Sequence, residues 1–308
     1  MSTLPHSRGP LPWLAFALCC SIWGSTFLFI RMSNDSMPPL WGAALRLGIA
    51  TLLFALLAVV LRRRWPDRAS VRATLIYGAV NFGVSLPLLY VGEKRVPSGL
   101  ASVLYATIPL TTAVFARLMG MEPLRPRIVG ASLVAIGGVA LLFSSRLSGD
   151  MDALHLVLVG MAATTAGMSG VLLKRAPRTD PFTTNVWAHG VGSLLCMAAS
   201  LALHETPALP QGDGWWPLAY LSVVGSIGAF TTFTWLIRRW PVTRMSFSAV
   251  IIPLVALMLG MIVLRERPGT TAFIGAAIVL GAVLVGLLGP AGAVVPGTPR
   301  TTGDSSDH

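Results

Sequence analysis

One arginine lies where a charge is costly. Arg46 falls inside the apolar run Leu40–Leu61 and is the only arginine or lysine well inside any such run. A cation inside a long apolar run must face protein, water or a counter-ion, so Arg46 is a candidate for attracting an anionic group on a small-molecule substrate. The alternative is structural, because Arg46 lies only about six residues into the run and its long side chain can reach outward or bond to carbonyl groups.

A histidine and several polar or aromatic residues also lie within apolar runs. His189 is the only one of the five histidines that lies in the middle of a run, and histidine titrates near neutral pH. It predicts either a proton relay or a hydrogen-bonded packing residue. The other candidates for a substrate pathway, each with interhelical bonding or packing as the alternative, are Trp23, Thr26, Asn81, Trp187 and Thr232.

Two glutamates lie at the ends of apolar runs, Glu122 beside Arg125 and Glu266 between Arg265 and Arg267. They are candidates for proton coupling. The alternative, which we favour, is a structural role at helix ends, because carboxylates near water have little reason to hold a proton at neutral pH. No carboxylate lies deep in any run, so coupling through His189, or no coupling, fits the residues better.

An enzymatic function has one weak signal. Gly167-Met168-Ser169-Gly170 resembles the motif of intramembrane serine proteases, and His189 lies one run further on, but four small residues also suit helix packing. The sequence has no HExxH motif, no phosphate-binding Walker loop and no Cys/His metal spacing. Cys19, Cys20 and Cys196 all lie in apolar runs. We therefore expect no enzyme, no cofactor and no bound metal.

The elements that hold these residues are membrane-spanning helices. Only 11% of the residues are charged and 54% are apolar, whereas soluble proteins carry roughly 25% charged residues. A span needs about 20 apolar residues. Ten candidate runs meet this need: Leu11–Ile30, Leu40–Leu61, Ala73–Gly92, Pro97–Met119, Ile128–Ser145, Ala153–Leu173, Phe182–Leu203, Trp215–Ile237, Val242–Leu264 and Thr270–Leu288. The first is expected to be a retained helix, with a start cleaved or lipidated at Cys19 or Cys20 as the alternative. The sequence predicts an all-α integral membrane protein with a disordered tail over 290–308.

Charge distribution predicts the orientation. With residues 1–10 in the cytoplasm, 16 lysines and arginines fall on the cytoplasmic side and six on the other. This asymmetry follows the positive-inside rule and places both termini in the cytoplasm. It also accounts for the net charge of +11, so we expect no nucleic-acid partner. The predicted location is the plasma or inner membrane.

A fixed spacing predicts an internal duplication. Pro97 and Pro241, Pro109 and Pro253, and Glu122 and Glu266 are each 144 residues apart. Residues 11–145 and 153–289 would then be two repeats of five helices. An odd number of helices inverts the second repeat, as in many secondary transporters.

Two features within these repeats leave alternatives open. Pro109 and Pro253 should kink their helices, either as hinges or as ordinary kinks. Small residues four apart, in Ala131-x-x-x-Ala135 and Ala277-x-x-x-Gly281, predict close packing either between the halves or between two copies in a homodimer.

These residues resemble the EamA-like branch of the drug/metabolite transporter superfamily over roughly residues 11–289. The resemblance is carried by Trp23-Gly24-Ser25-Thr26-Phe27, by Arg46, by the stretch from Pro97 through Pro109, Glu122 and Gly130, and by Pro241, Pro253, Glu266 and Gly275. It departs at Met121 and Arg265, where the family often has glycine, and at the charged turn Glu93-Lys94-Arg95. The resemblance implies secondary transport of a small metabolite or drug-like molecule by alternating access, and export in particular. The alternatives are an uncoupled facilitator or uptake permease and, from another class, a membrane-embedded enzyme or a regulatory protein.

Overall fold

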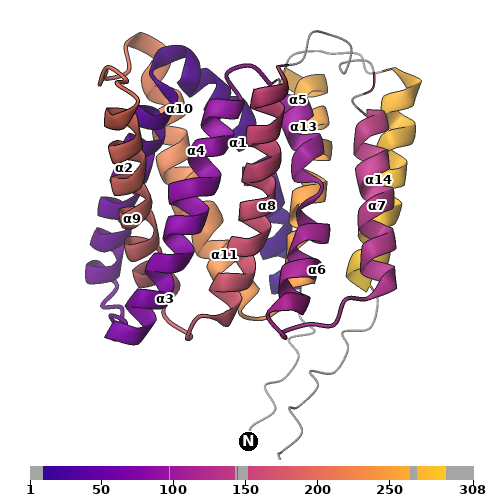
Figure 1. Cartoon of the computed structure of the whole chain (residues 1–308), viewed down its shortest axis with the longest axis horizontal. Helices are drawn as coiled ribbons and strands as arrows, with labels where there is room; N and C mark the ends of the chain where they lie inside the picture. The colour runs from indigo at the N-terminus through magenta and orange to yellow at the C-terminus, as the bar shows by residue number, and fades with distance from the viewer. Residues whose placement is uncertain (1–9, 97, 143, 145–151, 264–268, 289–308) are drawn as a thin grey trace, which may run out of the picture.

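A computed structural model describes residues 10–96, 98–142, 144, 152–263 and 269–288. Over these ranges the chain is almost entirely helical, and the helices run side by side along the vertical of Figure 1. Ten helical spans are present in the described ranges, which confirms the predicted all-helical membrane fold. Eight are long and apolar enough to cross a membrane. The other two are a 17-residue apolar helix, Pro126–Leu142, and a 22-residue helix, Pro181–Ala202, which carries several polar residues.

The chain order divides these spans into two sets of five. The first set is α1 (Leu11–Ser36), α2 (Pro39–Val60), the segmented span α3, η1 and α4 (Arg68–Gly78, Ala79–Ser85, Leu86–Gly92), the pair α5 and α6 (Ser98–Tyr105, Ile108–Leu118), and α7 (Pro126–Leu142). The second set is α8 (Ala153–Arg175), α9 (Pro181–Ala202), the segmented span α10, η4 and α11 (Trp215–Ser222, Val223–Gly228, Ala229–Ile237) after a short turn η3 (Gly212–Gly214), the pair α12 and α13 (Val242–Ser246, Ser248–Val263), and α14 (Thr270–Leu288). The predicted residues that lie outside the described ranges are 1–9, Pro97, Ser145, Leu264, Arg265, Glu266, Arg267 and residues 289–308.

The second set is inverted relative to the first. α1 begins on the lower face, defined as the face at the bottom of Figure 1, whereas α8 runs downward from the opposite, upper face. Both sets contain a π-helical segment in their third span, and these segments begin 144 residues apart, at Ala79 and Val223. This is the spacing of the proline pairs in the sequence. π-Helical turns are rare, so their recurrence supports the duplication.

Two helix crossings repeat in the same way. Gly24 of α1 lies against Val255 of α13, and Gly167 of α8 lies against Thr111 and Thr112 of α6. Val255 follows Thr111 by 144 residues. In each case a Cβ atom on the glycine would collide with the opposite helix, so glycine is what permits the close approach. The first span of each half therefore crosses the fourth span of the other.

Two helix pairs join the halves at the ends of the bundle. In Figure 1, α2 packs along α9 at the left end and α7 along α14 at the right. Gly275 of α14 approaches the backbone of Gly138 on α7 so closely that a Cβ atom would not fit. The two predicted small-residue motifs differ in exposure within the bundle: Ala131 and Ala135 are buried, whereas Ala277 and Gly281 are exposed.

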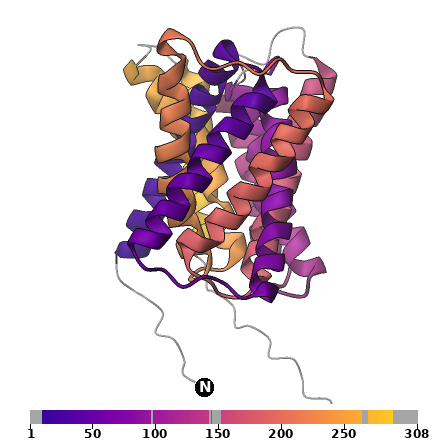
Figure 2. The same ribbon diagram turned by 90° about the vertical axis from the view of Figure 1, so that its left-hand side faces the viewer.

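Large apolar side chains cover the outside of the bundle, for example Leu52, Leu118 and Leu194, each more than 70% exposed. Such a surface would be unstable in water but costs nothing against lipid tails. Figure 2, turned by 90°, shows the same upright bundle from its end.

The fourth and ninth spans are broken near the centre of the bundle. α5 ends at Tyr105 and α6 begins at Ile108, while α12 ends at Ser246 and α13 begins at Ser248. Pro109 lies in the first turn of α6, where its missing amide costs little. Pro253 lies inside the continuous helix α13. The predicted kink at Pro109 is thus a full break just before it, and hinge motion at either proline stays a prediction.

Candidate substrate cavity

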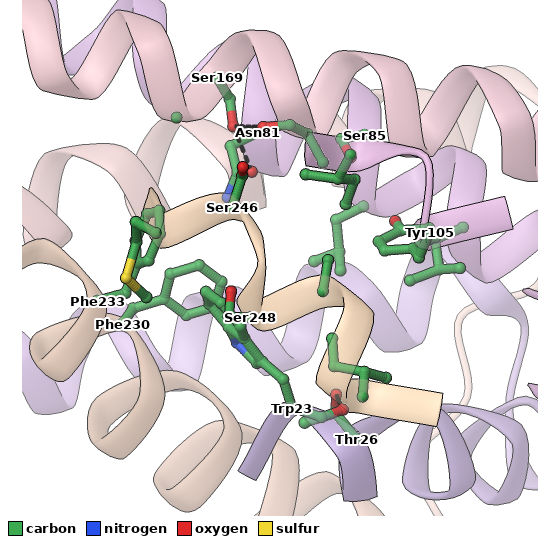
Figure 3. Close-up of a pocket in the computed structure, with 18 of the residues that line it drawn as sticks. Trp23, Thr26, Asn81, Ser85, Tyr105, Ser169, Phe230, Phe233, Ser246 and Ser248 are labelled. Atoms are coloured by element: carbon green, nitrogen blue, oxygen red, sulfur yellow. Dashed lines mark hydrogen bonds between the residues drawn. The ribbon is translucent and has the colours of Figure 1, made fainter. Parts of the chain in front are cut away.

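A cavity of about 140 Å³ lies between the two halves. Both halves line it, the first through α1, α2, η1, α4, α5 and α6 and the second through α8, α11, α12 and α13. Its wall is mainly apolar and aromatic. The polar lining residues are Thr26, Arg46, Asn81, Ser85, Tyr105, Thr112, Ser169, Ser246 and Ser248, and most of them appear in Figure 3. A mostly apolar concavity with a few placed polar groups is the usual form of a small-molecule site.

Arg46 reaches this cavity from α2 and is almost fully buried, at 3% exposure. Its Nε donates to Ser226 Oγ at 3.3 Å, its Nη1 to Tyr90 Oη at 3.4 Å, and its Nη2 to the carbonyl oxygen of Gly225 at 3.3 Å. Gly225 and Ser226 belong to the π-helical segment η4. Tyr90 lies in α4 of the same half as Arg46, so the guanidinium is held by neutral groups of both halves.

The charge of Arg46 has no carboxylate within 4 Å among the described residues. A buried cation without a counter-ion is unfavourable, and an anion that enters the cavity would relieve that cost. Within the described part of the chain, Arg46 is also the only arginine, lysine, aspartate or glutamate in the cavity wall. The arrangement is suited to binding one anionic group.

A second polar group lies on the other π-helical segment. Asn81 of η1 accepts a hydrogen bond of 2.8 Å at Oδ1 from Ser169 Oγ of α8, and Ser169 also donates to the carbonyl of Ala166. Figure 3 shows Ser246 of α12 beside this pair. Asn81 and Gly225 are 144 residues apart. The two π-helical segments thus present different chemistry at equivalent positions: a side-chain amide at Asn81 and a carbonyl that holds Arg46 at Gly225.

Aromatic rings form much of the remaining wall. Trp23 of α1 packs against Phe233 and Phe230 of α11, with ring centroids 5.1 and 5.6 Å apart. Phe27 meets Tyr105 edge to face at 5.3 Å. These contacts give the cavity flat apolar surfaces on both halves, which suit a ligand with a planar or apolar body.

Four of the predicted pathway residues come together here: Trp23, Thr26, Arg46 and Asn81. Thr26 lines the cavity while donating to the carbonyl of Trp23 at 2.7 Å. The other three lie elsewhere. Trp187 is 38% exposed on α9, and Thr232 of α11 donates to the carbonyl of Gly228 in η4, within the same segmented span.

His189 is buried behind the cavity wall. Its ring packs against Phe82 at 4.0 Å and Phe230 at 5.3 Å, and both phenylalanines line the cavity while His189 does not. Its Nδ1 lies 3.1 Å from the carbonyl of Asn185. Ser169 donates to Asn81 and Ala166 rather than to His189, so these two residues do not form a nucleophile and base pair.

Glu122 binds the opposite half on the lower face. Its carboxylate accepts from the amide of Val242 at 2.7 Å and from the hydroxyl of Thr243 at 2.5 Å. It therefore caps the first turn of α12. Glu266, for which we predict an equivalent structural role, lies outside the described residues.

Two further carboxylates were not singled out from the sequence as site residues. Glu205 accepts from the amides of Leu40 and Trp41 and so caps α2 on the upper face. Glu93, at the end of α4, is fully buried and close enough to Tyr90 and Tyr105 to act on both electrostatically. The sequence signal for Glu93 was the charged turn Glu93-Lys94-Arg95, which departs from the family pattern.

Comparison with known proteins places the chain in a family. The model of the EamA-like transporter family matches residues 11–144 and again 154–288. The uncharacterised inner membrane transporter YedA of Escherichia coli is 32% identical over 283 residues, which cover 91% of each chain. An uncharacterised transporter of Archaeoglobus fulgidus is 29% identical over 288 residues, covering 87% of this chain and 95% of the relative.

A crystal structure of another protein shares the fold. It superposes with a TM-score of 0.74 at 18% sequence identity, covering 90% of this chain and 98% of that one. The two family matches fall on the two five-helix sets described above. This chain therefore belongs to the EamA-like transporter family.

Proposed function

We propose that this chain is a secondary transporter that carries a small molecule with one anionic group and an apolar or planar body. The observation that carries this proposal is the position of Arg46, a buried cation held only by neutral groups in the wall of a cavity between the halves. Arginine suits this role because its planar fork can bind a carboxylate through two hydrogen bonds.

Alternating access is the proposed mechanism. Inverted halves have two equivalent arrangements, so rocking one half against the other can open a central site to either side. The cavity is lined by both halves, and its aromatic contacts join α1 to α11 across them. The breaks at Ala106–Thr107 and at Phe247 lie in the spans that line the cavity and are the proposed points of bending.

The proposed location is the inner membrane, as the name of the relative YedA states for that protein, with both termini cytoplasmic. The excess of arginine and lysine on the lower face supports this orientation. Export is the proposed direction and rests on the family resemblance. A homodimer is part of the proposal through the exposed small residues Ala277 and Gly281.

A flux assay in proteoliposomes tests the function. Purified protein is screened against small carboxylates, amino acids and neutral analogues, with and without a pH gradient. Arg46→Lys should fold normally and transport anionic substrates more slowly, because lysine lacks the bidentate fork. Arg46→Ala should abolish that transport.

The matched control is Arg117→Ala, which removes an exposed arginine from α6 outside the cavity. It should transport like the wild type. Normal flux in both Arg46 variants would make Arg46 structural and remove the anionic-substrate proposal. Substrate entry into vesicles that present only the lower face inward would argue for uptake instead of export.

A further inference from the structure

A second hollow lies on the lower face, and none of its lining residues lines the cavity between the halves. It is open, has a volume of about 570 Å³, and joins the connection between α2 and α3 to that between α8 and α9. Its lining residues are Leu61, Arg62, Arg63, Arg64, Trp65, Pro66, Asp67, Ser70, Arg178, Thr179 and Asp180. We call it the arginine pocket. The first half contributes three of its arginines and the second half contributes Arg178.

The two carboxylates in this pocket are already engaged. Asp67 accepts from the amide of Ser70 at 2.8 Å and caps α3, and hydrogen bonds from Ser70 lower the pKa of Asp67. Asp180 accepts from the amide of Phe182 at 2.8 Å, which caps α9, and it pairs with Arg63 at 3.8 Å. Both carboxylates thus serve helix N-termini.

Three arginines of the pocket form no ion pair with a carboxylate among the described residues. Arg62, Arg64 and Arg178 have no carboxylate within 4 Å among the described residues. Four arginines against two aspartates leave the pocket with a formal charge of +2. Positive charge continues beyond its rim, because Arg238 donates to the carbonyl oxygens of Ala176 at 2.7 Å and of Pro177 at 3.1 Å, directly before Arg178 in the chain. A pocket of this kind is suited to a phosphate or phosphodiester, which accepts several arginine hydrogen bonds at once.

The surroundings indicate the source of the phosphate. The pocket begins at the end of α2, whose last two turns expose Leu56, Val59 and Val60 at 58 to 65%. Trp65 in the pocket wall is 48% exposed, and tryptophan favours the level of lipid headgroups. A phospholipid can therefore place its phosphate in the pocket and its acyl chains along α2, whereas a free phosphate would leave the apolar surface unused.

We propose that the arginine pocket binds the headgroup of an anionic phospholipid and so links the two halves on the lower face. Basic pockets beside membrane helices bind such headgroups in other proteins. The proposal does not depend on the transported substrate.

Native mass spectrometry of the full-length protein in mild detergent tests this binding. The protein is titrated with phosphatidylglycerol and with phosphatidylcholine of identical acyl chains. The pocket variant is Arg62→Gln/Arg64→Gln/Arg178→Gln. Its matched control is Arg72→Gln/Arg117→Gln/Arg175→Gln, which removes three exposed arginines outside the pocket. Both leave 13 basic residues on the predicted cytoplasmic side from the original 16, so the charge asymmetry is equal.

The wild type should prefer phosphatidylglycerol, and the pocket variant should lose that affinity by roughly tenfold or more. The control should keep the preference. A third variant, Arg62→Lys/Arg64→Lys/Arg178→Lys, preserves the charge and should bind more weakly than the wild type because lysine lacks the planar fork. Equal loss in the pocket variant and the control would reduce the effect to net charge and overturn the proposal. Displacement of the lipid by inorganic phosphate would overturn the lipid assignment.

Discussion

The carboxylate of Glu122, in the connection between α6 and α7, lies 2.7 Å from the amide nitrogen of Val242, the first residue of α12. This hydrogen bond joins the first half of the chain to the second. α12 has no side-chain cap of its own, so Glu122 supplies both an acceptor and a negative charge at its N-terminus. The contact lies on the lower face, where the halves must separate if the cavity is to open there.

Glu122→Ala should open the lower face more often. The variant loses a helix cap, which costs about 1 kcal/mol. Because this contact must break when the halves separate on the lower face, its loss destabilises the closed arrangement relative to the open one. A single cysteine at Ser246, in a background without Cys19, Cys20 and Cys196, reports access to the cavity. In inverted membrane vesicles its labelling by an impermeant maleimide should be several-fold faster with Glu122→Ala.

Glu205→Ala is the matched control. Glu205 also bridges the halves as a helix cap, but on the upper face, where it binds α2. It should lower stability by a similar amount without faster labelling at position 246. Equal labelling in the two variants would mean that Glu122 has only a structural role and no part in closing the lower face.

The crossing of α6 and α8 gives a prediction about stability. Gly167→Ala would place a methyl group against Thr111 Oγ1 and the amide of Thr112, and such overpacking costs about 1–3 kcal/mol. Gly160→Ala, on the same helix, has no atom within 4 Å of the added group and should raise stability by about 0.5–1 kcal/mol. Thermal unfolding in detergent measures both. A Gly167→Ala protein as stable as the wild type would contradict the close crossing.

The ten helices and their duplication were predictable because each depends on a property of the chain alone. Apolar length marks a span. The spacing of 144 residues between Pro97 and Pro241, which recurs between Glu122 and Glu266, marks the repeat. Arg46 was identifiable for the same reason, since a lone cation in an apolar run is conspicuous whatever the packing. The π-helical segments at Ala79 and Val223 were not predictable, because no residue pattern distinguishes them from α-helix.

The facing of residues within a span was harder to predict. A membrane helix is apolar toward lipid and toward its neighbours, so its sequence does not show which side faces inward. Of the residues predicted to line a substrate pathway, Asn81 and Thr26 do line the cavity. Trp187 instead is exposed, and His189 lies behind Phe82. Ser246 was missed because the helix break that brings it to the cavity depends on tertiary packing.

Topology is testable by labelling in intact cells. Single cysteines at Ser2, Ala69 and Ser306 should be protected from an impermeant reagent, because the charge count of 16 against six places these positions in the cytoplasm. A cysteine at Asp213, on the exposed turn η3 of the opposite face, is the positive control and should be labelled. External labelling at any of the three protected sites would overturn the orientation.

Burial identifies the residue at which proton coupling can be tested. Glu93 is fully buried near Tyr105, which lines the cavity, whereas Glu122 is partly exposed and engaged as a cap. A buried carboxylate can exchange a proton only when an opening cavity brings water to it, which is the property that coupling requires. If a pH gradient drives transport, Glu93→Gln should remove the response to that gradient while retaining exchange of substrate across the membrane.

His189→Asn is the comparison that decides between the buried carboxylate of Glu93 and the buried imidazole of His189. His189 is separated from the cavity by Phe82 and Phe230, so water that enters the cavity does not reach its ring unless those phenylalanines move. The His189→Asn protein should therefore keep its response to the gradient, and Glu122→Gln should keep it too, with some loss of stability. Substrate flux is measured at several pairs of internal and external pH for each variant. A His189→Asn protein that folds normally and ignores the gradient would make the histidine the coupling residue, and it would require the aromatic wall to open during transport.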